Sequence, residues 1–286
     1  MFKPDPLQIY CRRIGLAKAP PVSVAGLLAL QEAHRRHIAF ENLDVMLGRG
    51  IDLAAPAVFA KLVDRGRGGY CFEHNRLFAA MLEKAGFSCR LLLARVLLGD
   101  PPALPPLTHC LVLAEIEGAS WIADTGFGGA YAPPLPLRDG AEAHSGDGAR
   151  HRLRRLDAAD AAQGEWLLER LGPVEATDGR GAGGGWQKQF AFDLRQVAYA
   201  DCEIGNHWTS THPAARFTNH HVVSLCLPDG FASMVDRELS VFRAGSEPAR
   251  HTIGDAQDYA QVLSEVFGLD VPLADVTRLP LFAAQG

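Results

Sequence analysis

Apolar residues in the first ninety positions repeat every three or four residues, a pattern that predicts helices. We expect helices to start at Ser23, a candidate N-cap, at Pro56, which suits a first turn, and near Cys71. The helix from Cys71 keeps its apolar side chains on one face, and Gly86 is placed to end it. A further helix is predicted over residues 255–267, where the same spacing returns.

Beyond Gly86 the pattern changes to short runs rich in branched residues, separated by Gly, Pro and Asp clusters. Such runs are typical of strands, so we expect an antiparallel sheet or a small barrel. The predicted strands cover residues 88–98, 109–116, 120–125, 186–192, 221–227 and 231–235. Two stretches rich in small residues, 139–149 and 179–186, are predicted to be loops.

Composition narrows the class of protein. The chain has 286 residues, of which 48% are hydrophobic and 21% charged, as in globular proteins. Its six cysteines lack the spacing of a disulfide framework and are interpreted as reduced thiols, which favours the cytoplasm. The sequence has no signal-peptide pattern and no apolar run of the roughly 18 residues that a membrane span needs.

The distribution of charge is uneven. A formal net charge of −5 argues against nucleic acid as a partner. Residues 1–100, however, carry 14 Lys and Arg against 9 Asp and Glu. This basic first third suits a small anionic ligand.

The first candidate for chemistry is a cysteine in the segment RGRGGYCFEHN. Cys71 follows a glycine-rich turn and stands at the first turn of a predicted helix. A helix N-terminus carries roughly half a positive charge, which is expected to lower the pKa of the thiol below its usual value of about 8.5. Arg65 and Arg67 would add to this effect. The sequence therefore predicts a nucleophilic thiolate near neutral pH.

A base and an orienting acid are predicted on the hairpin that follows. If residues 117 and 118 pair at its turn, Leu111 lies opposite Asp124, and His109 shares a sheet face with Asp124. A register slip of one residue would separate the two side chains. Cys, His and Asp together predict nucleophilic catalysis. A metal site is the weaker interpretation, because a second tight Cys/His pair with zinc-finger spacing is missing.

Four motifs resemble the arylamine N-acetyltransferases, in that family's order and spacing. They are IAFENLD (38–44), RGGYCFEHNRLF (67–78), WIADTGFGG (121–129) and NHWTSTHPAARF (206–217), with the strand of His109 between the second and third. Papain-like proteases share the Cys, His order but not these surroundings. His74 departs from the family pattern, and two interpretations stay open: it perturbs the thiolate, or it faces solvent.

The resemblance implies an α+β fold with a catalytic core like that of cysteine proteases. Its three parts would be a helical bundle (1–87), an antiparallel β-barrel (88–190) and an α/β lid (191–286). It implies a catalytic triad of Cys71, His109 and Asp124. It further implies an acceptor pocket of Val96, Phe127 and Phe217, and coenzyme A (CoA) contacts from Gly126, Gly128, Gly129, Thr209, Ser210 and Thr211. Ordinary core packing and turn formation are the alternatives for these two groups.

The implied activity is ping-pong transfer of an acetyl group from acetyl-CoA, through a Cys71 thioester, to an arylamine or arylhydrazine. Acetyl-CoA would be a co-substrate, with no bound cofactor and no metal, and the enzyme would be a monomer or weak homodimer. Three alternatives stay open: an amide synthase of the same superfamily, a cysteine-dependent thioester or amide hydrolase, and a binding module without activity.

Overall fold

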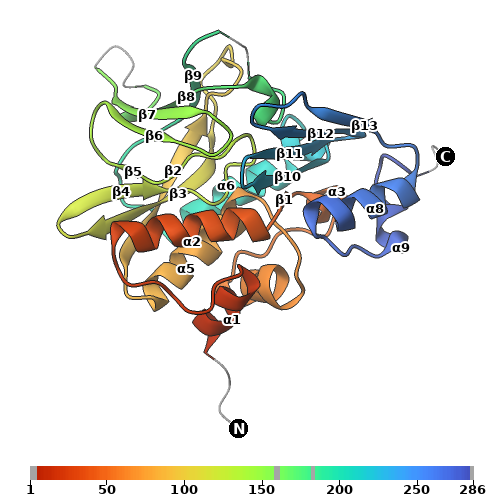
Figure 1. Cartoon of the computed structure of the whole chain (residues 1–286), viewed down its shortest axis with the longest axis horizontal. Helices are drawn as coiled ribbons and strands as arrows, with labels where there is room; N and C mark the ends of the chain where they lie inside the picture. The colour runs from red at the N-terminus through yellow and green to blue at the C-terminus, as the bar shows by residue number, and fades with distance from the viewer. Residues whose placement is uncertain (1–4, 158–161, 182–183, 284–286) are drawn as a thin grey trace.

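The chain forms two antiparallel sheets and a set of helices beneath them (Figure 1). We analysed a computed structural model that describes residues 5–157, 162–181 and 184–283. The eight-stranded sheet has the order β5-β4-β3-β2-β9-β8-β7-β6, and the five-stranded sheet has the order β1-β10-β11-β12-β13. The edge strands β5 and β6 contact each other, so the larger sheet is a nearly closed barrel. The predicted α+β class with a barrel is confirmed.

The N-terminal helices lie below the barrel in Figure 1. The three helices expected in this region are confirmed, and the Ser23 hydroxyl caps the second helix by accepting the Gly26 N–H at 3.1 Å. Phe59 ends a short helix that continues into η1, a π-helical turn. The elements are α1 (Pro6–Arg13), α2 (Val24–His37), α3 (Leu43–Met46), α4 (Ala55–Phe59), η1 (Ala60–Asp64) and α5 (Cys71–Lys84).

One loop prediction in the barrel is wrong. Residues 139–149 contain strand β6, which pairs with β7 at Ala141 and Leu153. The segment AEAH has no branched residue, so pairing with β7 and not local propensity makes it a strand. The barrel strands are β2 (Ser88–Val96), β3 (Leu107–Ile116), β4 (Ala119–Ala123), β5 (Leu135–Pro136), β6 (Ala141–His144), β7 (Arg150–Arg155), β8 (Trp166–Leu171) and β9 (Gln187–Phe192).

The second predicted loop, 179–186, has no regular secondary structure at its described residues. Residues 182–183 of that loop lie outside the described residues. It follows a short turn of 3₁₀-helix, η2 (Val174–Ala176).

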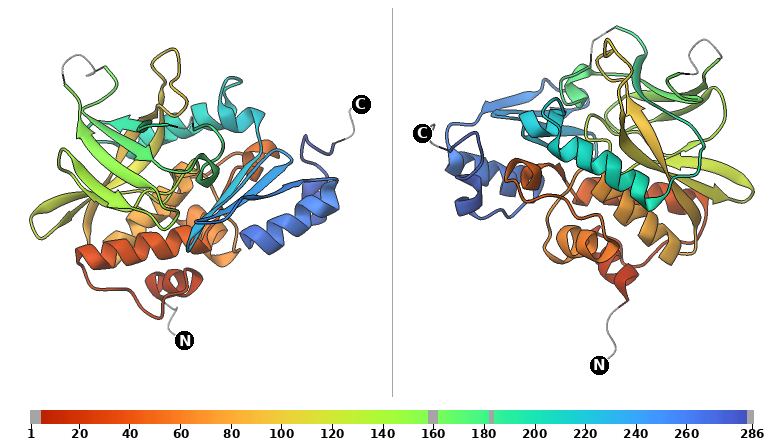
Figure 2. Two further views of the ribbon diagram at one scale, coloured as in Figure 1. Left: turned by 45° about the horizontal axis from the view of Figure 1, so that its top comes forward. Right: turned by 180° about the vertical axis from the view of Figure 1, so that it is seen from behind.

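The five-stranded sheet combines a strand from the first third of the chain with four strands from the last third. Strand β1 comes from the first third and pairs with β10 through Phe40 and Ser224. Helices α8 and α9 pack on one face of this sheet, at the right of Figure 1. Figure 2, seen from behind, shows α6 crossing the back of the molecule beside the barrel. The elements are β1 (Phe40–Glu41), α6 (Tyr199–Thr211), α7 (Arg216–Asn219), β10 (Val222–Leu227), β11 (Gly230–Val235), β12 (Glu238–Arg243), β13 (Ala249–Thr252), α8 (Ala256–Phe267) and α9 (Leu273–Val276).

Two apolar cores hold the site from below and from inside the barrel. The first joins α1, α2 and α5 to the outer face of β3, and the second fills the barrel. No helix in the described part of the chain is both long and apolar enough to span a membrane.

Candidate active site

Cys71 is the first residue of α5, as its motif predicts. Its side chain is 3% exposed, and its Sγ–H points to the Thr108 carbonyl oxygen at 3.6 Å. Glu73 closes the helix start from within, because its Oε2 accepts the Tyr70 N–H at 3.1 Å. The nucleophile candidate is therefore held between a helix start and the residue before His109.

The hairpin register is the one the sequence predicts. Val112 pairs with Ala123, which places Leu111 opposite Asp124 and brings His109 to the same face. His109 Nε2 lies 2.7 Å from Asp124 Oδ2. Because Nε2 donates to the carboxylate, Nδ1 is the ring nitrogen left to accept a proton. The ring itself packs against both Phe127 and Phe190, at centroid distances of 5.2 and 5.0 Å.

The second carboxylate oxygen of Asp124 is bound on the opposite side from His109. Oδ1 accepts from Asn75 Nδ2 at 2.9 Å and from the Gly126 N–H at 2.8 Å. Burial raises the pKa of this carboxyl, but the His109 ring and these two donors outweigh it and hold the pKa below its usual range. Asp124 is therefore ionised at neutral pH and fixed in orientation.

Sequence reasoning missed two residues of α2 that support this loop. Gln31 accepts the Asp124 N–H at 2.7 Å and donates to the Ala132 carbonyl oxygen at 2.7 Å. Arg35 donates to the carbonyl oxygens of Thr125 and Phe127 at 3.0 and 3.2 Å. Both side chains are essentially buried. Their sequence signal was present: they are polar, four residues apart and on the same side of the helix as Leu27.

The expected depression of the thiol pKa is wrong for Cys71 taken alone. Burial raises the pKa of the Cys71 thiol, and the negative charge of Asp124 raises it further. The Phe72 N–H at the helix start opposes both but does not prevail. A thiolate in this site therefore needs a local proton acceptor, and a helix dipole is not sufficient.

A pocket of about 70 Å³ opens beside Cys71 and His109. All three predicted acceptor residues line it: Val96, Phe127 and Phe217. The three predicted glycines line it as well. Gly126 is required for space, since a Cβ there would lie 2.6 Å from the Cys71 carbonyl oxygen, and at Gly128 a Cβ would meet the Phe40 ring at 2.7 Å. Close packing against Cys71 and Phe40 thus explains why positions 126 and 128 are glycine, whereas turn formation alone does not.

The three hydroxyl residues predicted to contact CoA lie apart from this pocket, in the last turns of α6. Each hydroxyl donates to the carbonyl oxygen four residues earlier: Thr209 to Gly205, Ser210 to Asn206 and Thr211 to His207, at 2.7, 2.8 and 2.6 Å. Their role in binding CoA stays a prediction.

Three charged residues that the sequence did not indicate line the pocket. Arg180 Nη2 lies 2.8 Å from Asp178 Oδ2, and Arg216 Nη2 lies 3.6 Å from the same oxygen. Two guanidinium groups thus share one carboxylate. This wall of the pocket is positively charged on balance.

His74 is buried, so the solvent-facing interpretation is wrong. It is fully buried, its Nε2–H donates to the Ala39 carbonyl oxygen at 3.1 Å, and its Nδ1 accepts from His34 Nε2 at 2.8 Å. Burial lowers the pKa of His74 to about 3. His34 in turn accepts the Tyr10 hydroxyl at 2.8 Å. The chain of three rings is satisfied only when both histidines are neutral.

Within residues 5–157, 162–181 and 184–283, no group of three or more His, Cys, Asp or Glu side chains is arranged to hold a metal ion.

Comparison with known proteins gives one consistent result. A family model described as N-acetyltransferase matches residues 23–276. The arylamine N-acetyltransferase of Escherichia coli is 35% identical, over 93% of this chain and 89% of its own length. The solved structure of the Salmonella typhimurium enzyme has a TM-score of 0.87 at 31% identity, over 97% of this chain and 98% of that chain.

A second solved structure, the arylamine N-acetyltransferase of Mycobacterium marinum in complex with CoA, has a TM-score of 0.83 at 28% identity. The match covers 96% of this chain and 98% of that chain. The family model spans most of the sequence, and the relatives match along nearly their whole length. The chain belongs to the arylamine N-acetyltransferase family.

Proposed function

We propose that this protein transfers an acetyl group from acetyl-CoA to an arylamine or arylhydrazine through a thioester on Cys71. The observation that carries the proposal is the 2.7 Å contact between His109 and Asp124. The Cys71 thiol lies next to this pair, because it donates to the carbonyl oxygen of Thr108, the residue before His109. The type of reaction is inferred from family membership, and the residues that would perform it are inferred from this geometry.

In the first half-reaction, the Cys71 thiol gives its proton to His109 Nδ1. The imidazolium then lies beside the Asp124 carboxylate, which stabilises the positive charge. The thiolate sulfur attacks the carbonyl carbon of the acetyl thioester, and the bond from that carbon to the CoA sulfur breaks. His109 returns the proton to the leaving CoA sulfur. Because burial raises the pKa of the thiol, proton transfer within the pair is the step that creates the nucleophile.

In the second half-reaction, the amine nitrogen attacks the acetyl carbon on Cys71. An arylamine is neutral at pH 7, so its lone pair is available without prior deprotonation. His109 takes the proton that the amine loses, and the Cys71 sulfur leaves and recovers it. The apolar side chains of Val96, Phe127 and Phe217 would hold the aromatic ring, and the three pocket glycines would leave room for the acyl group.

The donor is proposed to be acetyl-CoA because the M. marinum relative was solved with CoA. Thr209, Ser210 and Thr211 stay candidates for CoA contacts, and the positive wall of Arg180 and Arg216 is an additional one. We further propose that the enzyme works in the cytoplasm as a monomer or weak homodimer, and that residues 1–87, 88–190 and 191–286 act as bundle, barrel and lid.

The test is a CoA-release assay with a panel of arylamines and hydrazines and several acyl-CoA donors, followed by intact mass. We expect a stable acetyl adduct on Cys71 without acceptor, its loss on addition of an arylamine, and no adduct in Cys71→Ala. An adduct that decays without amine would indicate a hydrolase. Acylation from a carrier protein but not from CoA would indicate an amide synthase.

A further inference from the structure

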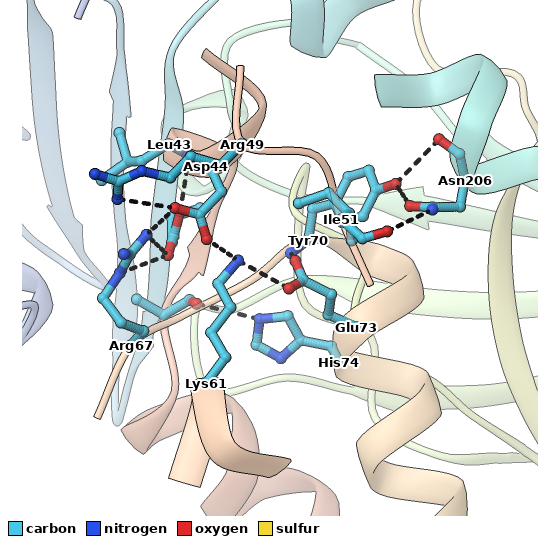
Figure 3. Close-up of polar contacts among 12 residues, drawn as sticks. Leu43, Asp44, Arg49, Ile51, Lys61, Arg67, Tyr70, Glu73, His74 and Asn206 are labelled. Carbon is cyan, nitrogen blue, oxygen red and sulfur yellow. Dashed lines mark hydrogen bonds and ion pairs between the residues drawn. The ribbon is translucent and has the colours of Figure 1, made fainter. Parts of the chain in front are cut away.

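A buried lysine lies behind the start of α5. Lys61 is 6% exposed, and its ammonium lies 2.8 Å from both Asp44 Oδ2 and Glu73 Oε1 (Figure 3). Glu73 is 2% exposed, and its other oxygen accepts the N–H of Tyr70, the residue before Cys71. One hydrogen bond therefore links the ammonium–carboxylate pair to the backbone of the residue before the nucleophile.

The local backbone is shaped to make this contact. Lys61 belongs to η1, where the Arg65 N–H bonds to the Ala60 carbonyl oxygen at 3.0 Å, five residues back. Such π-turns are rare and occur frequently at functional sites. On the other side, Gly69 leaves room for the carboxylate, since a Cβ there would lie 2.8 Å from Glu73 Oε2. The chain thus accommodates the pair on both flanks, by a π-turn at Lys61 and by the missing Cβ of Gly69.

Tyr70 is also held from its far end. Its hydroxyl donates to the Asn206 side chain of α6, and Asn206 Nδ2 donates to the Ile51 carbonyl oxygen at 3.1 Å (Figure 3). The residue before the nucleophile is thus fixed at its amide by Glu73 and at its phenol by α6. Only the amide end depends on a buried charge.

We propose that Lys61 is a positioning residue for acetyl transfer: by pairing with Glu73, it holds that carboxylate on the Tyr70 amide and thereby sets the position of the Cys71 sulfur relative to His109. A buried carboxylate without a cation is unstable, so the loss of Lys61 would release or neutralise Glu73. Glu41, also near Glu73, carries the same sign and would not compensate. The inference rests on the proposed role of Cys71.

The test measures the single-turnover rate constant of Cys71 acetylation at saturating acetyl-CoA, with the KM for acetyl-CoA and the melting temperature. For Lys61→Met we expect the rate constant to fall by about 10²-fold, the effect of a ~1 Å misplacement, with KM unchanged. Lys61→Arg should restore most of the rate, because the charge is kept and the adjoining cavity of about 610 Å³ leaves space for a guanidinium. A purely structural role would lower the melting temperature and leave the rate of the folded enzyme unchanged.

A double-mutant cycle with Glu73→Gln tests whether Lys61 acts through Glu73. We expect the double variant to be no slower than the slower single variant, because both changes remove the same link. Additive losses would overturn the inference. If Lys61→Met does not fold, Glu73→Gln alone decides, and a wild-type acetylation rate there would refute the proposal.

The matched control is Arg49→Gln. Arg49 lines the same cavity and pairs with Asp44 at 3.5 Å, but it does not contact Glu73, so its acetylation rate should equal that of the wild type. The two failures are distinguishable. Absence of any acetyl-Cys71 in the wild type would refute the proposed function, whereas a normal wild type with an equally fast Lys61→Met would refute this inference alone.

Discussion

Asp124→Asn tests how the tautomer of His109 is set. The Asp124 Oδ1 position faces two donors, Asn75 Nδ2 and the Gly126 N–H, so the oxygen of an asparagine amide must occupy it. The new NH₂ group would then face His109 Nε2, which in the wild type lies 2.7 Å from the carboxylate oxygen. Two donors cannot bond to each other, so the imidazole would place its proton on Nδ1 and present Nε2 as an acceptor.

The size of the loss follows from this switch. A proton on Nδ1 removes the base that faces the thiol, while the fold keeps every contact of Asn75 and Gly126. In a serine protease the equivalent change lowers kcat by about 10⁴. A similar loss here corresponds to about 5 kcal/mol in activation free energy. Cys71 also depends on its base, because burial raises the pKa of the free thiol.

The assay is CoA release during the first turnover, with thermal melting as the control for folding. We expect the acetylation rate to fall by about 10⁴, with a melting temperature close to that of the wild type. Gln31 still accepts the backbone N–H of residue 124 in the variant, which keeps the loop in place. An Asp124→Asn enzyme within tenfold of the wild-type rate would refute the assigned roles of His109 and Asp124.

Three further predictions follow from the geometry. His74 and His151 are buried, and their pKa values are lowered to about 3, so below about pH 6.5 the unfolded chain binds more protons than the folded one. The free energy of unfolding, measured with urea, should therefore be highest above that pH and fall by roughly 2 kcal/mol per histidine between pH 7 and 5. Gly126→Ala would place a Cβ 2.7 Å from the Cys71 Cα and should cost about 1–3 kcal/mol of stability and slow acetylation, whereas normal kinetics would contradict the tight approach. Salt should raise the KM for acetyl-CoA, and Arg216→Gln should weaken this dependence; an unchanged salt profile in the variant would remove Arg216 from donor binding.

The sequence predicted the parts of the site that depend on periodicity. Helical spacing placed Cys71 at a helix start, and the two-residue alternation of strands gave the register that joins His109 to Asp124. It did not predict strand β6, whose existence depends on its partner β7, nor the pKa of the thiol, which depends on burial. Periodicity is local information, whereas burial is decided by what the rest of the chain places over a residue.

Four residues that hold the site, of which sequence reasoning missed Gln31, Arg35 and Glu73, share one physical property: they are polar side chains on the buried faces of helices. Gln31 and Arg35 on α2, and Glu73 and Asn75 on α5, are each at most 2% exposed. Burying such groups costs free energy unless every donor and acceptor finds a partner, and their bonds to the Asp124 loop, Tyr70 and Lys61 meet that demand. Each of these bonds fixes a backbone or side-chain atom next to Cys71, His109 or Asp124. Buried polar groups would weaken these helices if they had no partners. The hydrogen bonds that satisfy them therefore also hold the reacting groups in one geometry.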